Sequence, residues 1–304
     1  MTITHSIIIP THNRPEGLVR AVASAIVEAG ETGEVIVVDD ASDRPAEDVL
    51  RDVSFERLRH LRSPTPMAGG GSPARNMGAR EARGEFLFFL DDDDEFLPGY
   101  CASILNEGAR AEADFGFSAR EFAEASDRDA PKITTETRGM ATGVIPWQIE
   151  FPEKTFPFSA GFWLTKAGYA EVGPMEHGLR TNSDTEYACR LYSSSLRGWY
   201  SAEPGVRIYE HVAQSATETR NVTKRTRSAD RANAFAAIAA RHADFLKRDK
   251  SAGRFVYTRL AKHAARAGQR TEALAAIRKI EPWTAGLKAC LLTLPSMIRT
   301  GGGD

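Results

Sequence analysis

Six aspartates in two short runs are the residues of this sequence best suited to metal and nucleotide chemistry. Asp39 and Asp40 end the apolar run EVIVV, and four aspartates at 91–94 directly follow the apolar run EFLFFL. Adjacent carboxylates repel one another, and a hard divalent cation with oxygen ligands is the usual way to neutralise them. In open α/β sheets, ligands bind beyond the carboxyl ends of the strands, where side chains from several strands meet. The two runs therefore predict a cation site at one edge of a sheet.

The second run allows more than one geometry. Along an extended strand end, Asp91 and Asp93 would point one way and Asp92 and Asp94 the other, so that only one face holds a metal. A solvated turn is the alternative interpretation. A calcium loop of the EF-hand type is excluded, because Phe96 occupies the sixth position, where glycine is required.

The elements that must position these aspartates follow from the apolar pattern. Short apolar runs predict four buried strands, at 6–10, 34–38, 58–61 and 85–90. A helical spacing follows the first strand, and the loop GGGSPARN begins a second helix that ends by Gly84. Strands that alternate with helices and read as continuous apolar runs predict an α/β fold with a mostly parallel sheet, covered on both faces. Later, GWYSAEPGVRIYEH predicts a strand pair, and alanine- and arginine-rich segments after about residue 220 predict helices.

Composition and charge place few limits on function but divide the chain. It has 304 residues, 42% hydrophobic and 26% charged, with a formal net charge of −2. From Arg220 onward there are 18 basic and 6 acidic residues, whereas the remainder has 21 basic and 35 acidic residues. We therefore expect an acidic body and a basic C-terminal region that meet different partners.

Cysteine usage and the chain start predict a cytoplasmic protein. Cys101, Cys189 and Cys290 lie too far apart for a disulfide framework or a zinc site, which favours a reducing compartment. The N-terminus lacks the basic leader of a signal peptide. No run of the sequence reaches the roughly eighteen apolar residues of a membrane-spanning helix.

Two nucleotide-binding motifs are absent from the sequence. No GxGxxG follows the first strand, which disfavours a dinucleotide fold, and no GxxxxGK[ST] is present, which excludes a P-loop enzyme. Arg75, near the start of the second helix, is suited to an anion, with a surface ion pair as the alternative.

Taken together, SIIIPTHNRP, EVIVVDDAS and ARNMGAREARGEFLFFLDDDD closely resemble, in this order and spacing, the family two inverting glycosyltransferases with the GT-A fold. The resemblance covers about the first 100 residues and extends more loosely to about residue 215. It implies a Rossmann-like GT-A catalytic domain at 1–218, with a nucleotide-sugar-binding half at 1–100 and an acceptor half at 101–218. A basic, mostly helical appendage would follow at 219–304.

The resemblance also implies roles for single residues on the nucleotide side. The loop that surrounds the nucleoside is matched by Pro10, Thr11 and His12. The acidic pair that binds base and ribose is matched by Asp39 and Asp40, and the ARN element beside the nucleotide by Arg75 and Asn76.

The metal-binding motif of the family, DxD, matches Asp91, Asp92 and Asp93. The match implies that Asp93 is the main ligand of Mn²⁺ or Mg²⁺ and that Asp91 contacts the ribose or the waters of the metal. Asp92, also on the nucleotide-sugar side, stands where a small neutral residue is more usual. His211 resembles a C-terminal histidine that closes the site over the metal or the diphosphate. A structural hydrogen bond is the alternative for this histidine.

The catalytic base implied by the resemblance is Asp184, in NSDTE, where the family places an acidic pair at a helix start. Ser183 replaces the usual glutamate before it. The alternative is structural: Ser183 and Glu186 form a capping box, with Asp184 favoured by the positive end of the helix.

The resulting hypothesis is a metal-dependent inverting transfer of a sugar from a nucleotide diphosphate sugar, preferably a UDP-sugar, to an acceptor hydroxyl. The acceptor would be a saccharide or a lipid-linked saccharide of polysaccharide or glycoconjugate assembly. A sugar nucleotidyltransferase is disfavoured because PTHNRP is no glycine- and arginine-rich loop, and an inactive nucleotide-sugar-binding module is the third reading.

Acceptor and surface contacts are less defined by the sequence. Trp147, Phe158 and Trp163 are candidates to stack on a sugar, with core packing as the alternative. The basic C-terminal region predicts a peripheral contact with the inner face of a membrane, and a plain helical cap is its alternative. Nucleic acid is not expected, because aromatic residues are not interleaved with the basic ones.

Overall fold

The computed structural model describes residues 2–68, 70–124, 132–210 and 226–282. The chain forms two compact units that alternate along the sequence: the first is Met1–Trp147, Phe156–Gly178 and Ser194–Val212, and the second is Gln148–Thr155, Leu179–Ser193 and Ala213–Asp304. The functional domains that the resemblance implies, at 1–218 and 219–304, stay predictions, since the two units are defined by packing alone.

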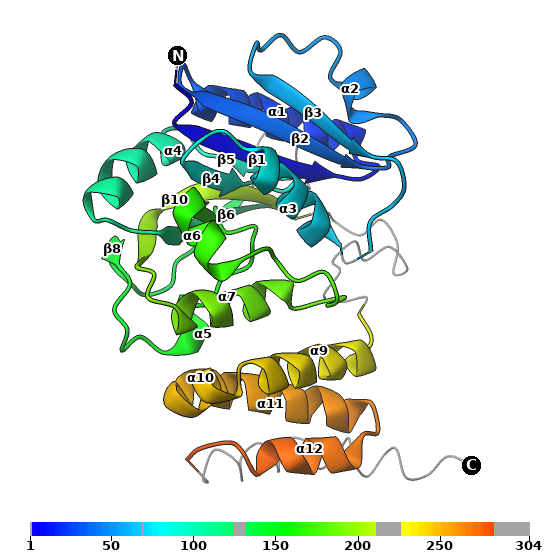
Figure 1. Ribbon diagram of the computed structural model, residues 1–304, viewed down its shortest axis with the longest axis vertical. Helices are drawn as coiled ribbons and strands as arrows, with labels where there is room; N and C mark the ends of the chain where they lie inside the picture. The colour runs from blue at the N-terminus through cyan, green and yellow to red at the C-terminus, as the bar shows by residue number, and fades with distance from the viewer. Residues whose placement is uncertain (1, 69, 125–131, 211–225, 283–304) are drawn as a thin grey trace. The chain divides into compact units, whose positions relative to one another are not determined.

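One ten-stranded sheet forms the first unit, and Figure 1 shows its first three strands side by side in blue. The strand order is β3-β2-β1-β4-β9-β6-β10-β5, with β7 paired to β6 and β8 paired to β10. The strands are β1 His5–Thr11, β2 Gly33–Asp40, β3 Leu58–Ser63, β4 Phe86–Phe89, β5 Glu95–Phe96, β6 Phe115–Glu124, β7 Ile133–Glu136, β8 Gly143–Val144, β9 Trp163–Thr165 and β10 Gly198–Glu210.

The first four strands are parallel, as the sequence predicts: β1 lies between β2 and β4, and β3 pairs with β2. β9 runs antiparallel between β4 and β6, and β6 pairs in parallel with β10. This mixed, mostly parallel α/β sheet confirms the predicted fold class. The predicted strand pair at 198–211 is wrong, because β10 is one strand with register shifts between Ser201 and Val206. These irregularities accommodate Pro204, which has no N–H for the ladder.

Both faces of the N-terminal strands are covered, which explains their continuous apolar runs. Ile7 and Ile9 belong to a buried cluster that also contains Leu18 and Val22 of helix α1 (Pro15–Ala29). Ile8 points to the other face, where a Cβ added at Gly78 of helix α3 (Gly71–Glu81) would lie 2.4 Å from its side chain. Alternation along a strand therefore places α1 and α3 on opposite faces.

Helices of the first unit connect these strands. They are α1 Pro15–Ala29, α2 Ala46–Val49, α3 Gly71–Glu81, α4 Tyr100–Ser103 with a π-helical turn at Ile104–Gly108, and α6 Lys166–Val172. Cys101 is a buried free thiol of this unit, and Cys189 is one of the second unit. Cys290 lies outside the described residues.

The second unit is helical: α5 Phe151–Lys154, α7 Ser183–Ser193, α9 Ser228–Arg241, α10 Ala243–Arg248, α11 Lys250–Arg266 and α12 Arg270–Ile277. Figure 1 shows α9 to α12 in yellow to orange. Their core includes Phe235, Val256 and Ala261 together with Phe151 of α5 and Ala188 of α7. Among the helices that the structure describes, none combines the length and the apolar character needed to cross a membrane.

Candidate nucleotide-sugar and metal site

The ends of β1, β2 and β4 bring the predicted site residues to one edge of the sheet. Thr11 closes β1 and pairs in register with Asp39 near the end of β2. β4 lies on the other side of β1, parallel to it, and leads into the four aspartates at 91–94. We name these four aspartates the acidic turn.

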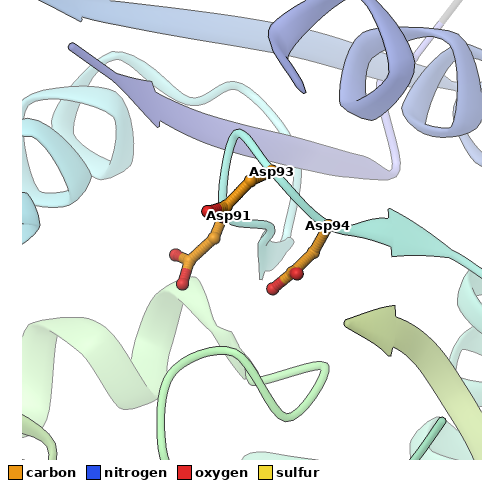
Figure 2. Close-up of side chains that lie close together, drawn as sticks. All are labelled: Asp91, Asp93 and Asp94. Atoms are coloured by element: carbon orange, nitrogen blue, oxygen red, sulfur yellow. The ribbon is translucent and has the colours of Figure 1, made fainter. Parts of the chain in front are cut away.

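The acidic turn is a reverse turn, because the backbone N–H of Asp94 donates to the carbonyl oxygen of Asp91 at 3.2 Å. The predicted extended strand end is therefore wrong: Asp91 and Asp93 lie together and Asp92 faces away from them, as expected, but the turn places Asp94 with Asp91 and Asp93. Asp91, Asp93 and Asp94 each offer a carboxylate oxygen, and these oxygens lie within 4.8 Å of one another. Figure 2 shows Asp91 and Asp94 extending to the same side of the loop, with the side chain of Asp93 directed toward Asp91.

Asp92 faces away from this group, into the first unit. It is 5% exposed and accepts hydrogen bonds from Thr11 Oγ1 at 2.7 Å and from Arg14 at 3.0 Å. Burial, opposed by Arg14, raises the pKa of Asp92 to about 6. Asp92 is thus an internal anchor that joins the acidic turn to the end of β1.

Two arginines from separate elements pair with the acidic turn. Arg14 Nη1 lies 2.5 Å from Asp93 Oδ2, and Arg75 of α3 forms an ion pair with Asp91. Arg75 is 8% exposed, with its guanidinium carbon 5.2 Å from the ring centroid of Phe158, so the surface ion pair considered from the sequence is wrong. Its buried Nε has no hydrogen-bond partner in the described part of the chain.

The charge balance of the acidic turn leaves two negative charges when all four aspartates are ionised, since Arg14 and Arg75 offset two of them. Burial, with repulsion from Asp91 and Asp93, raises the pKa of Asp94 well above its ordinary value. The backbone N–H of Tyr209 offsets this only in part. A divalent cation would supply the missing charge, and three convergent carboxylate oxygens are the hard ligands that Mg²⁺ and Mn²⁺ prefer. The residues therefore fit such an ion.

Helix α1 supports the acidic turn from behind. A Cβ added at Gly17 would lie 2.6 Å from the carbonyl oxygen of Asp92, so only glycine allows this approach. Arg20, one turn later, donates to the carbonyl oxygen of Asp93 at 2.8 Å and pairs with Glu95 at 3.3 Å. These contacts hold the backbone of the turn in place.

The acidic pair at the end of β2 divides into an internal and an accessible member. Asp39 is buried and accepts the backbone N–H groups of Ser42 and Ala46, and it pairs with Arg62 at 2.7 Å. Burial alone would raise the pKa of Asp39, but these donors outweigh it and hold the pKa below its ordinary value. Asp40 is half-buried, and its Oδ1 accepts the backbone N–H of Met67 at 2.6 Å.

The loop after β1 lies beside this pair. Pro10 is buried within β1, and the exposed ring of His12 contacts the carbonyl oxygen of Asp40 through Nδ1 at 2.6 Å. His12 and Asp40 thus form one rim of the sheet edge, opposite the acidic turn on the far side of β1.

Asn76 holds a loop rather than facing an open site. It is fully buried, its Nδ2 donates to the carbonyl oxygen of Met175, and its Oδ1 accepts the Met175 N–H, both at 2.8 Å. Tyr169 and His177 contact the same amide. Asn76 therefore joins α3 to the segment after α6.

Asp184 lies in the first turn of α7, in the second unit, where its Oδ1 accepts the backbone N–H of Thr185 at 2.6 Å. Glu186 is fully buried, and its two oxygens accept hydrogen bonds from Arg190 at 2.8 Å, from Arg241 at 3.1 Å and from His242 at 3.0 Å. Burial raises the pKa of Glu186, but these partners outweigh it and lower the pKa to about 2. The alternative in which Glu186 is part of a capping box is wrong, because its carboxylate is occupied by these three side chains.

Among the other candidates, Trp163 is fully buried against Phe86 and Phe88, so it is a core residue rather than a sugar platform. Phe158 is 7% exposed and Trp147 is 82% exposed, and a role of either as a sugar platform stays a prediction. His211, the third metal candidate, lies outside the described residues.

Comparison with known families gives a match between residues 6–173 and the model of Glycosyl transferase family 2. The matched segment is more than half of the chain and contains Asp39, Asp40 and the acidic turn. The chain belongs to glycosyl transferase family 2. The motif order that suggested this family from the sequence is thereby confirmed.

Curated relatives match the N-terminal part of this family 2 chain. An uncharacterized glycosyltransferase of Haemophilus influenzae is 37% identical over 101 residues, 33% of this chain and 33% of that protein. The GalNAc(5)-diNAcBac-PP-undecaprenol beta-1,3-glucosyltransferase of Campylobacter jejuni is 33% identical over 108 residues, 34% of this chain and 35% of that protein. The match thus spans about a third of the length of these relatives.

A solved structure is similar over nearly the whole family 2 chain. The crystal structure of S. aureus TarS 1-349 in complex with UDP-GlcNAc has a TM-score of 0.68 at 15% identity and covers 97% of this chain and 89% of that one. This likeness confirms the predicted GT-A fold.

Three residues of importance were missed from the sequence. The sequence pattern places Asp94 on the opposite side from Asp91 and offers a helix cap for Glu186. For Arg14 the sequence does hold a signal: an acidic run needs nearby cations, and THNRP places an arginine at the end of the strand beside β4.

Proposed function

We propose that this chain transfers a sugar from a nucleotide diphosphate sugar to an acceptor hydroxyl, with inversion, in a reaction that requires Mn²⁺ or Mg²⁺. The observation that supports this most directly is the acidic turn, in which three carboxylate oxygens lie within 4.8 Å of one another at a strand end of a family 2 chain.

Asp91, Asp93 and Asp94 would hold the cation. When bound there, the divalent ion would act as a Lewis acid on the diphosphate leaving group. Arg75 would contribute a second positive charge, since its buried Nε keeps an unused donor in the described structure.

The nucleoside would lie along the rim formed by His12 and Asp40. Asp40 is the better candidate for the ribose, because the carboxylate of Asp39 is already occupied by backbone N–H groups and Arg62. Thr11, Asp92 and Asn76 would act by positioning, since their polar groups are satisfied inside the protein.

Asp184 is proposed as the general base that takes the proton of the acceptor hydroxyl. Its support is its place in the motif order of the family, at the start of an observed helix. A positioned carboxylate of this kind typically contributes about 10²- to 10⁴-fold to the rate.

Donor and acceptor follow by analogy. TarS was crystallised with UDP-GlcNAc, which favours a UDP-sugar here, and the Campylobacter jejuni relative is named for a polyprenol-linked glycan. A saccharide or lipid-linked saccharide acceptor and a role in polysaccharide or glycoconjugate assembly are therefore proposed. Action in the cytoplasm, with the basic C-terminal region at the inner face of a membrane, belongs to the same proposal.

The test is a product assay with purified protein and a panel of UDP-sugars, with Mn²⁺ or with EDTA. We expect release of UDP that depends on the metal. Release of pyrophosphate from a sugar phosphate and a nucleoside triphosphate would instead show a nucleotidyltransferase, and donor binding without turnover on any acceptor would indicate an inactive module.

The base is tested separately with Asp184→Asn. This variant should bind UDP and Mn²⁺ in calorimetry as the wild type does, while transfer falls by about 10²-fold or more. Wild-type transfer by this variant would remove Asp184 from the mechanism and leave the metal site untouched.

A further inference from the structure

A hollow of about 350 Å³ lies in the second unit, between α10, the first half of α11 and the segment after α12. Leu246, Gly253 and Tyr257 form its buried lining. A Cβ added at Gly253 would lie 2.6 Å from the carbonyl oxygen of Leu246, so glycine permits the close approach of α10 and α11 there. The hollow is therefore a consequence of how these two helices pack.

Besides Ala243, the rest of the lining consists of five cationic side chains and one acidic side chain. The cations come from three separate places: the end of α10, α11 and the segment after α12. They are Lys247, Lys250, Arg254, Arg278 and Lys279, and the acid is Glu281. We name this feature the basic hollow.

Ion pairs neutralise only part of this charge. Lys250 pairs with Glu281 at 2.8 Å, and Arg254 pairs with Glu150. Lys247, Arg278 and Lys279 are exposed and have no acidic partner among the residues described, so about three positive charges remain. Lys279 Nζ lies 5.4 Å from the ring centroid of Tyr257, which directs one of these charges over the aromatic lining.

The surroundings strengthen the attraction for anions. Residues 226–282 contain 13 arginines and lysines against 5 aspartates and glutamates. A concave site lined by one sign of charge concentrates field lines and draws ligands of the opposite sign. Arginine beside lysines is suited to phosphate, which a guanidinium binds through two parallel hydrogen bonds.

We propose that the basic hollow binds the phosphate group of a phosphate ester, with Lys247, Arg278 and Lys279 on the phosphate and Tyr257 against the organic part. A volume of about 350 Å³ accommodates a phosphate with part of its substituent. The buried aromatic lining favours an ester over inorganic phosphate. The ester is either a soluble compound or the headgroup of an anionic phospholipid, and this proposal stands independently of the transferase activity.

The experiment uses the full chain without metal or donor and compares two double variants. Lys247→Gln with Arg278→Gln removes two unpaired cations of the basic hollow. Lys262→Gln with Arg266→Gln is the matched control, since it removes the same charge from exposed positions of α11 outside the hollow. Circular dichroism and thermal midpoints verify that both variants fold.

Two binding measurements distinguish the sources of phosphate. Calorimetry with glycerol 3-phosphate reports a soluble ester, and sedimentation with phosphatidylcholine vesicles, with and without phosphatidylglycerol, reports a headgroup. The hollow variant should weaken binding by about tenfold in at least one arm, and the control by less than about twofold. Loss in the first arm alone assigns a soluble ester, loss in the second alone a headgroup, and loss in both a phosphate group from either source. Absence of binding by the wild type in both arms, or equal losses in the two variants, would overturn the proposal.

Discussion

Asp94 of the acidic turn and Glu186 of α7 are both buried carboxylates, at 3% and 0% exposure, yet their surroundings have opposite effects. Asp94 lies among other aspartates, and burial with their repulsion raises its pKa. Glu186 accepts hydrogen bonds from two arginines and a histidine, which overcome burial and lower its pKa to about 2. The fold itself supplies cations for the charge of Glu186 but not for that of Asp94.

This difference separates structural from functional carboxylates. Removing a buried charge that has its own cations is costly, because the cations are left buried and unpaired, whereas a buried charge without cations destabilises the fold and persists where a ligand supplies the compensation. The converging carboxylates of Asp91, Asp93 and Asp94 should therefore be dispensable for folding and required for binding, and that of Glu186 the reverse.

The largest effect is expected for Asp93→Ala. Removing one of the three convergent oxygens should lower metal-dependent UDP binding and transfer by about 10³-fold, with little change in unfolding free energy. Calorimetry with UDP and Mn²⁺, beside urea unfolding, tests both statements. Asp43→Ala, an exposed aspartate near the same sheet edge, is the control and should keep wild-type binding. A variant that bound UDP and Mn²⁺ normally would exclude Asp93 as a ligand.

Glu186→Gln should have the opposite outcome. It removes the charge that pairs with Arg190 and Arg241, so the free energy of unfolding should fall by about 3 kcal/mol. Urea unfolding followed by circular dichroism measures this, and exposed Glu272→Gln in α12 should change it by less than about 0.5 kcal/mol. Equal effects of the two variants would contradict the structural role of Glu186.

Gly17→Ala tests whether α1 sets the position of the acidic turn. The added methyl group meets the Asp92 carbonyl, so stability should fall by about 2 kcal/mol and Mn²⁺ affinity should fall with it. Electron paramagnetic resonance of free Mn²⁺ gives the affinity. Gly108→Ala is the matched control, because its Cβ would have no neighbour nearer than 3.4 Å. Unchanged Mn²⁺ affinity in Gly17→Ala would show that contacts other than those with α1 hold the acidic turn in position.

His263 of α11 should make the stability of the second unit depend on pH. Burial, reinforced by Arg231 and Lys262, lowers its pKa from 6.5 to about 4. Below about pH 6.5 the unfolded chain binds a proton at His263 that the folded chain does not bind, so stability is highest above that pH and falls by about 3 kcal/mol toward pH 4. Urea midpoints at pH 7 and pH 4.5 should differ less in His263→Phe. A ring that titrates near 6.5 in NMR spectra would contradict this.

The smallest change in stability, and one of opposite sign, is expected for Asp94→Asn. Its amide can still accept the Tyr209 N–H but carries no charge, so the protein should be more stable by about 1 kcal/mol while Mn²⁺ binding weakens. Thermal midpoints and Mn²⁺ titrations together test this. Destabilisation would mean that Asp94 is compensated within the fold, as Glu186 is.

Local patterns were sufficient for the N-terminal half of the fold. The apolar runs predicted β1 to β4, and strand ends rich in aspartate predicted where the site residues gather. The same pattern indicated Asp91 and Asp93 as candidates, because apolar periodicity and the residues that end a strand are encoded within a few positions.

What the sequence did not reveal depends on partners distant in the chain. The turn that brings Asp94 to Asp91 is held by Arg14, Arg20 and the close approach of Gly17, from a helix more than seventy residues earlier. The local sequence around Glu186 fits a helix cap, because the partners that show its actual role, Arg241 and His242, are fifty-five or more residues away. No local window contains these contacts.

The alternation of the two units along the chain has a practical consequence. α7, with Asp184 at its start, and α5 share their core with α9 to α12, so Phe151, Ala188 and Cys189 would face water if the chain stopped at residue 218. The C-terminal helices cannot be trimmed away to leave a minimal catalyst, because the segment bearing the proposed base would lose the scaffold that folds it.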